Sequence, residues 1–174
     1  SGNNIEHHEY HGENFSHYTN DVFVSPNHRL HYIGFPDFSA VSPEFADSGN
    51  VGILDLVEAL KWVHNNIANF GGDPNNVTII GQSGGGAKVC NLVAMPETKG
   101  LIHKAVALSG NATSAINKEA AQGLGKAILD AAGLKPNEIK KLQEMPFEEY
   151  MALANKVQRE YAQTNPGLGR FGFG

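Results

Sequence analysis

The chain is a mildly acidic sequence of 174 residues with a formal net charge of -5 at pH 7. This length is sufficient for one domain with a sizeable core. The negative charge and the lack of any basic run argue against nucleic acid or an anionic membrane as a partner, and no apolar run is long enough to span a bilayer. One cysteine, Cys90, excludes an intramolecular disulfide, and we expect it to be a small core residue.

Histidines near the start of the chain have a spacing that can chelate a metal ion. His7 and His11 are four residues apart, as two ligands on one helix face would be, and His8 and His17 lie close by. Gly12 interrupts the helix that this spacing would need, and no cysteine is nearby. We therefore favour a solvated segment over a metal site, and we expect no metal or organic cofactor.

Strand and helix signals alternate through the first 111 residues. Residues 21–27 are predicted to form a short strand. Apolar residues recur at helical spacing over residues 53–67 and predict a helix that packs on a sheet and ends at the turn 71–74. The β-branched run 77–80 predicts a buried parallel strand, and residues 104–108 predict another. This alternation predicts an α/β fold with a mostly parallel sheet and flanking helices.

The C-terminal part of the chain is predicted to be helical. Three helices are expected, over residues 117–132, 137–144 and 147–163. We therefore expect a single partial domain over residues 1–174, in which residues 1–111 form the sheet core and residues 112–174 form a mainly helical segment.

The most informative segment is the run VTIIGQSGGG, residues 77–86. Gly81 and Gly85 lie two residues before and after Ser83, which gives the G-x-S-x-G pattern of a nucleophile elbow. At such a turn the serine backbone is strained and the chain passes close to itself, so we expect side chains at both flanking positions to clash. The Ser83 hydroxyl would lie at the amino end of the next helix, where the N–H of Gly84 is the first expected donor to an oxyanion.

Two other interpretations of this segment stay open. The first is a phosphate-binding loop, because Gly81, Gly86 and Lys88 nearly match G-x-x-x-x-G-K-[ST]. Against it, Ala87 intervenes, and Val89 replaces the hydroxyl that would bind magnesium. The second is a glycine-rich turn without chemistry.

A longer stretch, from Gly49 to Gly86, resembles the type B carboxylesterase and cholinesterase-like family of α/β-hydrolases. The family pattern G-N-x-G-L-x-D-Q, A-L-x-W-V-x-x-N-I, F-G-G-D-P and G-E-S-A-G stands here as GNVGILDL, ALKWVHNNI, FGGDP and GQSGG. Residues 27–35 and 104–111 extend the resemblance. It implies part of an α/β-hydrolase fold and, with Ser83 as nucleophile, a serine hydrolase that acts on small-molecule carboxylic esters.

The chain departs from the family pattern at four positions. Gln82 replaces the acidic residue before the serine, which makes cationic, choline-like esters less expected. Gly84 replaces an alanine, Leu56 a glutamine, and His28 the tyrosine of N-Y-R-L. The nucleophile Ser83 is kept. This favours a hydrolase over a non-catalytic adhesion or binding module, since relatives of that kind typically lose the serine.

The resemblance implies roles for further residues. Ser109 matches a family serine close to the catalytic group, so we expect Ser109 and Gln82 to lie beside the nucleophile, although a simple strand-ending turn would also explain Ser109. Arg29 and Asp55 match a family arginine and aspartate. They predict a partly buried, structural ion pair.

The catalytic base and acid are expected outside this sequence. α/β-Hydrolases supply them after the serine, as Asp or Glu and then His. The one histidine after Ser83 is His103, which precedes the strand 104–108 and so lies at the opposite end of the sheet, roughly 16 Å away. His64 lies within the predicted helix 53–67 and is interpreted as a structural or surface residue.

The family's H-G-G-G segment, a further source of oxyanion donors, has no match in the chain either. We therefore expect an internal piece of a longer polypeptide, whose remainder is needed to complete the fold. The resemblance slightly favours a secreted or periplasmic location.

Overall fold

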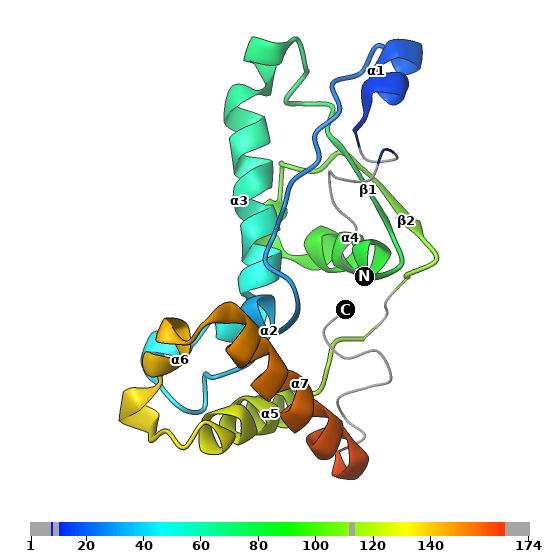
Figure 1. Cartoon of the computed structure of the whole chain (residues 1–174). Coiled ribbons are helices and arrows are strands. Elements are labelled where there is room, and N and C mark those ends of the chain that lie inside the picture. The colour runs from blue at the N-terminus through cyan, green and yellow to red at the C-terminus, as the bar shows by residue number, and fades with distance from the viewer. Residues whose placement is uncertain (1–7, 9–10, 112–113, 166–174) are drawn as a thin grey trace. The chain divides into compact units, whose positions relative to one another are not determined.

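The computed structural model describes residues 8, 11–111 and 114–165. The chain divides into two compact units, each built from two segments (Figure 1). Ser1–Arg29 and Ile53–Ser114 form the first, here called the elbow unit. Leu30–Gly52 and Ala115–Gly174 form the second, the helical unit. None of the helices that the structure describes is long and apolar enough to cross a membrane.

A parallel strand pair is the centre of the elbow unit. β1 (Thr78–Gln82) pairs with β2 (Lys104–Leu108), so that Thr78 is opposite Lys104 and Gln82 is opposite Leu108. Parallel neighbours need a crossover connection, and the segment between these strands contains an α-helix that packs on both (Figure 1). The predicted order of strand, turn and helix is confirmed, but the prediction that this strand is buried is wrong, because the residues of β1 are exposed or only partly buried.

That helix, α4 (Gly84–Ala94), packs on the strands through its apolar face. Val89 and Leu92 are buried, three residues apart on one side of the helix. Lys88, next to them, is buried as well. Cys90 was expected to be a core residue, but it is only partly buried.

The long helix α3 (Val51–Asn66) continues into a 3₁₀ turn, Ile67–Phe70. Its buried side chains recur at helical spacing, as predicted: Ile53, Val57, Leu60 and Ile67. Gly71, with φ 85°, ends the turn in a left-handed conformation that suits glycine. The predicted helix and its stop are therefore confirmed.

The strand predicted over residues 21–27 is wrong. Residues 20–30 contain no regular secondary structure, and a short helix, α1 (Glu13–Thr19), precedes them after Gly12. A strand needs a neighbour that pairs with its backbone N–H and C=O groups, and the sheet of the described residues contains β1 and β2 alone. Val22 and Val24, two apolar residues of the predicted strand, are exposed.

The helical unit contains α2 (His31–Gly34), α5 (Lys118–Ala131), α6 (Lys141–Glu144) and α7 (Phe147–Thr164). α5 and α7 pack against each other (Figure 1). The expected helices 117–132 and 147–163 are confirmed to within one residue at each end. The expected helix 137–144 is instead a 3₁₀ turn, Pro136–Glu138, followed by the four residues of α6.

The core of the helical unit combines side chains from all four helices and the connecting segments. Its buried members are Tyr32, Phe38, Leu124, Ile128, Leu129, Ile139, Leu142, Tyr150, Ala154 and Val157. Two hydrogen bonds connect α2 to α7: the Tyr150 hydroxyl donates to the Tyr32 carbonyl at 2.7 Å, and the Tyr32 hydroxyl donates to Oε1 of Gln158 at 2.7 Å. Buried polar groups in this core are thereby satisfied.

Candidate active site

Ser83 lies at the sharp turn between β1 and α4. β1 ends at Gln82, α4 begins at Gly84, and Ser83 between them has φ 56° and ψ -120°, a strained backbone conformation for a residue with a side chain. The Ser83 N–H donates to the Leu108 carbonyl at 2.8 Å, and the Ser83 carbonyl accepts from the N–H of Ala87 at 3.1 Å. The predicted turn and its unusual backbone are confirmed.

Glycines allow the chain to fold closely around this turn. A Cβ on Gly81 would lie 2.3 Å from the backbone oxygen of Gly85, and one on Gly110 would lie 1.8 Å from that of Ser83. A Cβ on Gly85, in contrast, would meet nothing within 4 Å among the described residues. The expected clash is therefore correct for Gly81 and wrong for Gly85, whose own backbone is what approaches Gly81.

Gly110 was not singled out in the sequence. The signal that could have found it is the Ser-Gly pair directly after β2, because parallel neighbouring strands bring their carboxyl ends to one edge of a sheet. Ser109 stands at this edge with φ 53°, next to Leu108, which binds the Ser83 N–H. The structure thus brings Ser109 and Gly110 to the elbow, as parallel geometry implies for Ser109. A hydrogen-bonding role for Ser109 stays a prediction.

The elbow is open to solvent. Ser83 and Gln82 are both exposed, whereas Gly84 is partly buried. As the first residue of α4, Gly84 has a backbone N–H without an intrahelical acceptor. That N–H is available for an oxyanion at the positive end of the helix.

Arg29 and Asp55 form the predicted ion pair. The Arg29 guanidinium donates from Nε at 2.9 Å and from Nη2 at 2.6 Å to the two carboxylate oxygens, and the Arg29 N–H adds a bond of 2.9 Å. The side chains are 51% and 25% exposed, so the pair is less buried than expected. The hydrogen bond from Arg29 lowers the pKa of Asp55. For so exposed a pair we expect a contribution of about 1 kcal/mol to stability.

The two histidines considered as bases lie away from the elbow. His103 precedes β2, at the opposite end of the strand pair from Ser83, and its Nδ1 accepts the N–H of Val77 at 3.1 Å. This contact connects the starts of the two strands. His64 is exposed in the last turn of α3.

The histidine cluster near the start of the chain is only partly within the described residues. His7 lies outside them. Among the residues that the structure describes, no group of three His, Cys, Asp or Glu side chains is arranged to hold a metal ion.

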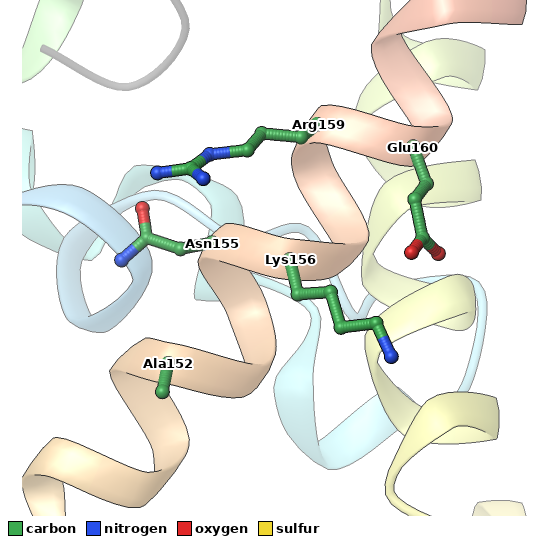
Figure 2. A pocket seen from close by; sticks show the side chains of 5 residues that line it. All are labelled: Ala152, Asn155, Lys156, Arg159 and Glu160. Carbon is green, nitrogen blue, oxygen red and sulfur yellow. The ribbon is translucent and has the colours of Figure 1, made fainter.

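A shallow hollow of about 380 Å³ lies on α7 in the helical unit. Figure 2 shows the side chains that line it, all from this one helix: Ala152, Asn155, Lys156, Arg159 and Glu160. These lining residues include no serine, cysteine or histidine that could act as nucleophile or base. The elbow is therefore the better candidate for chemistry.

The sequence from residue 2 to residue 168 matches the model of the carboxylesterase family. The chain belongs to this family. It is 39% identical over 137 residues to para-nitrobenzyl esterase of Bacillus subtilis (strain 168), and these residues are 79% of the chain and 27% of that protein. It is also 39% identical over 154 residues to liver carboxylesterase 1 of Oryctolagus cuniculus. These residues are 86% of the chain and 26% of that protein. The chain thus spans about a quarter of the length of these relatives.

Solved esterase structures resemble the chain in fold as well as in sequence. An esterase from Clostridium hathewayi, described as able to hydrolyse aliphatic aromatic polyesters, superposes with a TM-score of 0.80 at 41% identity, over 93% of this chain and 32% of that one. A thermophilic PNB esterase superposes with a TM-score of 0.73 at 38% identity, over 78% and 28% of the two chains. The chain is therefore part of an α/β-hydrolase fold, as predicted.

Proposed function

We propose that the protein hydrolyses carboxylic esters through an acyl-enzyme on Ser83. One observation carries the proposal: in a member of the carboxylesterase family, an exposed serine occupies a strained turn between a parallel strand and the amino end of a helix. A strained conformation at an exposed nucleophilic residue is typical of functional sites.

The proposed reaction has two steps. In the first, Oγ of Ser83 attacks the ester carbonyl carbon, the oxyanion of the tetrahedral intermediate accepts the Gly84 N–H, and the alcohol leaves with a proton. In the second, water attacks the acyl-enzyme by the same route and releases the acid. Because His103 is at the opposite end of the strand pair, we propose that a histidine and an acid from outside these 174 residues serve as base and orienting group.

The proposed substrates are uncharged esters of small molecules. Gln82 places a neutral side chain directly before the nucleophile, and it is exposed. A cationic alcohol group therefore gains no ion pair at this position.

The test compares two serine variants of the full-length protein. Ser83→Ala should lower the turnover of p-nitrophenyl acetate by about 10⁴-fold or more, because covalent catalysis is lost while the N–H donors remain. Ser16→Ala, on α1, is the matched control and should leave turnover unchanged. A fluorophosphonate should label the wild type and the control on Ser83.

Two outcomes would contradict the proposal. A folded Ser83→Ala variant that keeps more than about a tenth of wild-type turnover would exclude Ser83 as nucleophile. A wild-type protein without turnover and without an adduct on Ser83 would favour the non-catalytic binding module instead.

A further inference from the structure

Lys88 is a buried cation directly behind the elbow. Lys88 is 9% exposed, and its Nζ donates to the carbonyl of Gly84 at 3.5 Å. Side chains on a helix slope toward its amino end, which brings the ammonium group of Lys88 back along α4 by one turn. The charge therefore lies beside the residue that follows the nucleophile and supplies the proposed oxyanion donor.

This position is electrostatically unfavourable for an ammonium group. Burial disfavours the charged form and lowers the pKa of Lys88. The amino end of a helix carries partial positive charge, so it disfavours a cation there in the ground state. Charged groups held in such surroundings are candidates for a functional role.

The surroundings of Lys88 contain a second basic group, His28. Nε2 of His28 is buried and has no hydrogen-bond partner within the described part of the chain. Burial first, and then the charge of Lys88, lower the pKa of His28, while Asp55 on α3 acts in the opposite direction. Asp55 is itself hydrogen-bonded to Arg29. Burial and the charge of Lys88 thus hold His28 toward its neutral form.

We propose that Lys88 is a positioning residue for the reaction at Ser83: its ammonium group holds the Gly84 carbonyl, and its charge favours the oxyanion on the Gly84 N–H. The inference rests on the proposed esterase function. Backbone and hydrogen-bond dimensions place such an oxyanion within roughly 10 Å of the ammonium group. At that separation and an effective dielectric constant of about 20, one charge changes a rate by about tenfold.

The experiment compares Lys88→Met, Lys88→Arg and Lys104→Met in the full-length protein. Lys104 is the matched control, because it is an exposed lysine at the start of β2, hydrogen-bonded to Asn76 at 2.7 Å. With p-nitrophenyl acetate, Lys88→Met should lower kcat about tenfold with little change in KM, since the charge acts on the transition state. Lys88→Arg, which keeps the charge, should restore most of kcat, and Lys104→Met should match the wild type.

The outcomes separate this inference from the proposed function. A folded Lys88→Met variant with wild-type kcat, in a protein that Ser83→Ala inactivates, would overturn the role of Lys88 and leave the esterase function intact. A loss in Lys88→Met that Lys88→Arg does not restore would also overturn it, because the charge would then not be the cause. If Lys88→Met does not fold, Lys88→Gln, which keeps a donor for the Gly84 carbonyl but no charge, is judged by the same two results. Turnover that survives Ser83→Ala would instead refute the proposed function.

Discussion

In the helical unit, α5 buries its large apolar side chains, whereas the strand pair of the elbow unit leaves its own largely open. Leu124 and Ile128 in α5 are 0% exposed, but Ile80 in β1 and Leu108 in β2 are 60% and 45% exposed. The elbow unit also contains the strained serine of the proposed reaction. The fully buried side chains of α5 and the proposed nucleophile thus lie in different units. The predictions below test whether stability and catalysis can be perturbed separately.

The conformation of the elbow depends on backbone contacts more than on side-chain volume. Ser83 and Ser109 both have positive φ, a conformation that costs about 1–3 kcal/mol each when it is strained. The hydrogen bond from the Ser83 N–H to the Leu108 carbonyl and the close approach of Gly81 to Gly85 hold the chain in place. In the helical unit, complementary volumes have that role.

Among substitutions that keep Ser83 itself, Gly110→Ala is expected to have the largest effect. The new Cβ would lie 1.8 Å from the Ser83 carbonyl oxygen, so the nucleophile must move. A displacement of about 1 Å at a reacting group typically costs 10²-fold, and we expect kcat/KM for p-nitrophenyl acetate to fall by about that factor or more. Gly133→Ala in the helical unit is the control, because its site has positive φ but open space. It should lower stability by about 1 kcal/mol and leave the kcat of folded protein unchanged.

The reverse experiment perturbs packing alone. Leu124→Ala removes a fully buried side chain from the core of the helical unit and should lower the free energy of unfolding by about 2–5 kcal/mol, measured by urea titration. Val93→Ala, at an exposed position of α4, should change it by about 0.5 kcal/mol or less. If Leu124→Ala lowered the kcat of the folded protein as far as Gly110→Ala does, the two units could not be perturbed separately.

Much of this division could be predicted from the sequence. Periodicity predicted α3 because the helix has one apolar face, and helix start and stop signals predicted α5 and α7. The G-x-S-x-G pattern predicted the tight turn at Ser83. The family resemblance pointed to the Arg29 and Asp55 pair, which periodicity alone could not have found.

The rest depended on contacts between distant segments. Residues 21–27 contain β-branched and aromatic residues that are common in strands, but pairing is a property of two segments, and the described residues supply no partner. Gly110 is needed because its Cα lies against the backbone of Ser83, which is 27 positions earlier in the chain, and this contact cannot be read from the sequence. In the sequence, Lys88 was considered only as part of a phosphate-binding loop, because its burial follows from packing and leaves no pattern in the sequence.

The smallest expected effect is a pH dependence of stability caused by His28. Burial and the charge of Lys88 lower the pKa of His28 below 6.5 in the folded protein, so the unfolded chain binds a proton at higher pH than the folded chain does. The free energy of unfolding should therefore fall as the pH is lowered through 6.5 toward the folded-state pKa. The lowered pKa of Asp55 starts from 3.8, so that residue contributes only at more acid pH. Urea titrations between pH 7.5 and 5.5 should show a shallower slope for His28→Phe than for the wild type, and the wild-type slope for Asn27→Ala, which changes a neighbour without a titratable group. An unchanged slope in His28→Phe would mean that the imidazole is not held neutral beside Lys88, and the electrostatic description of the region behind the elbow would be wrong.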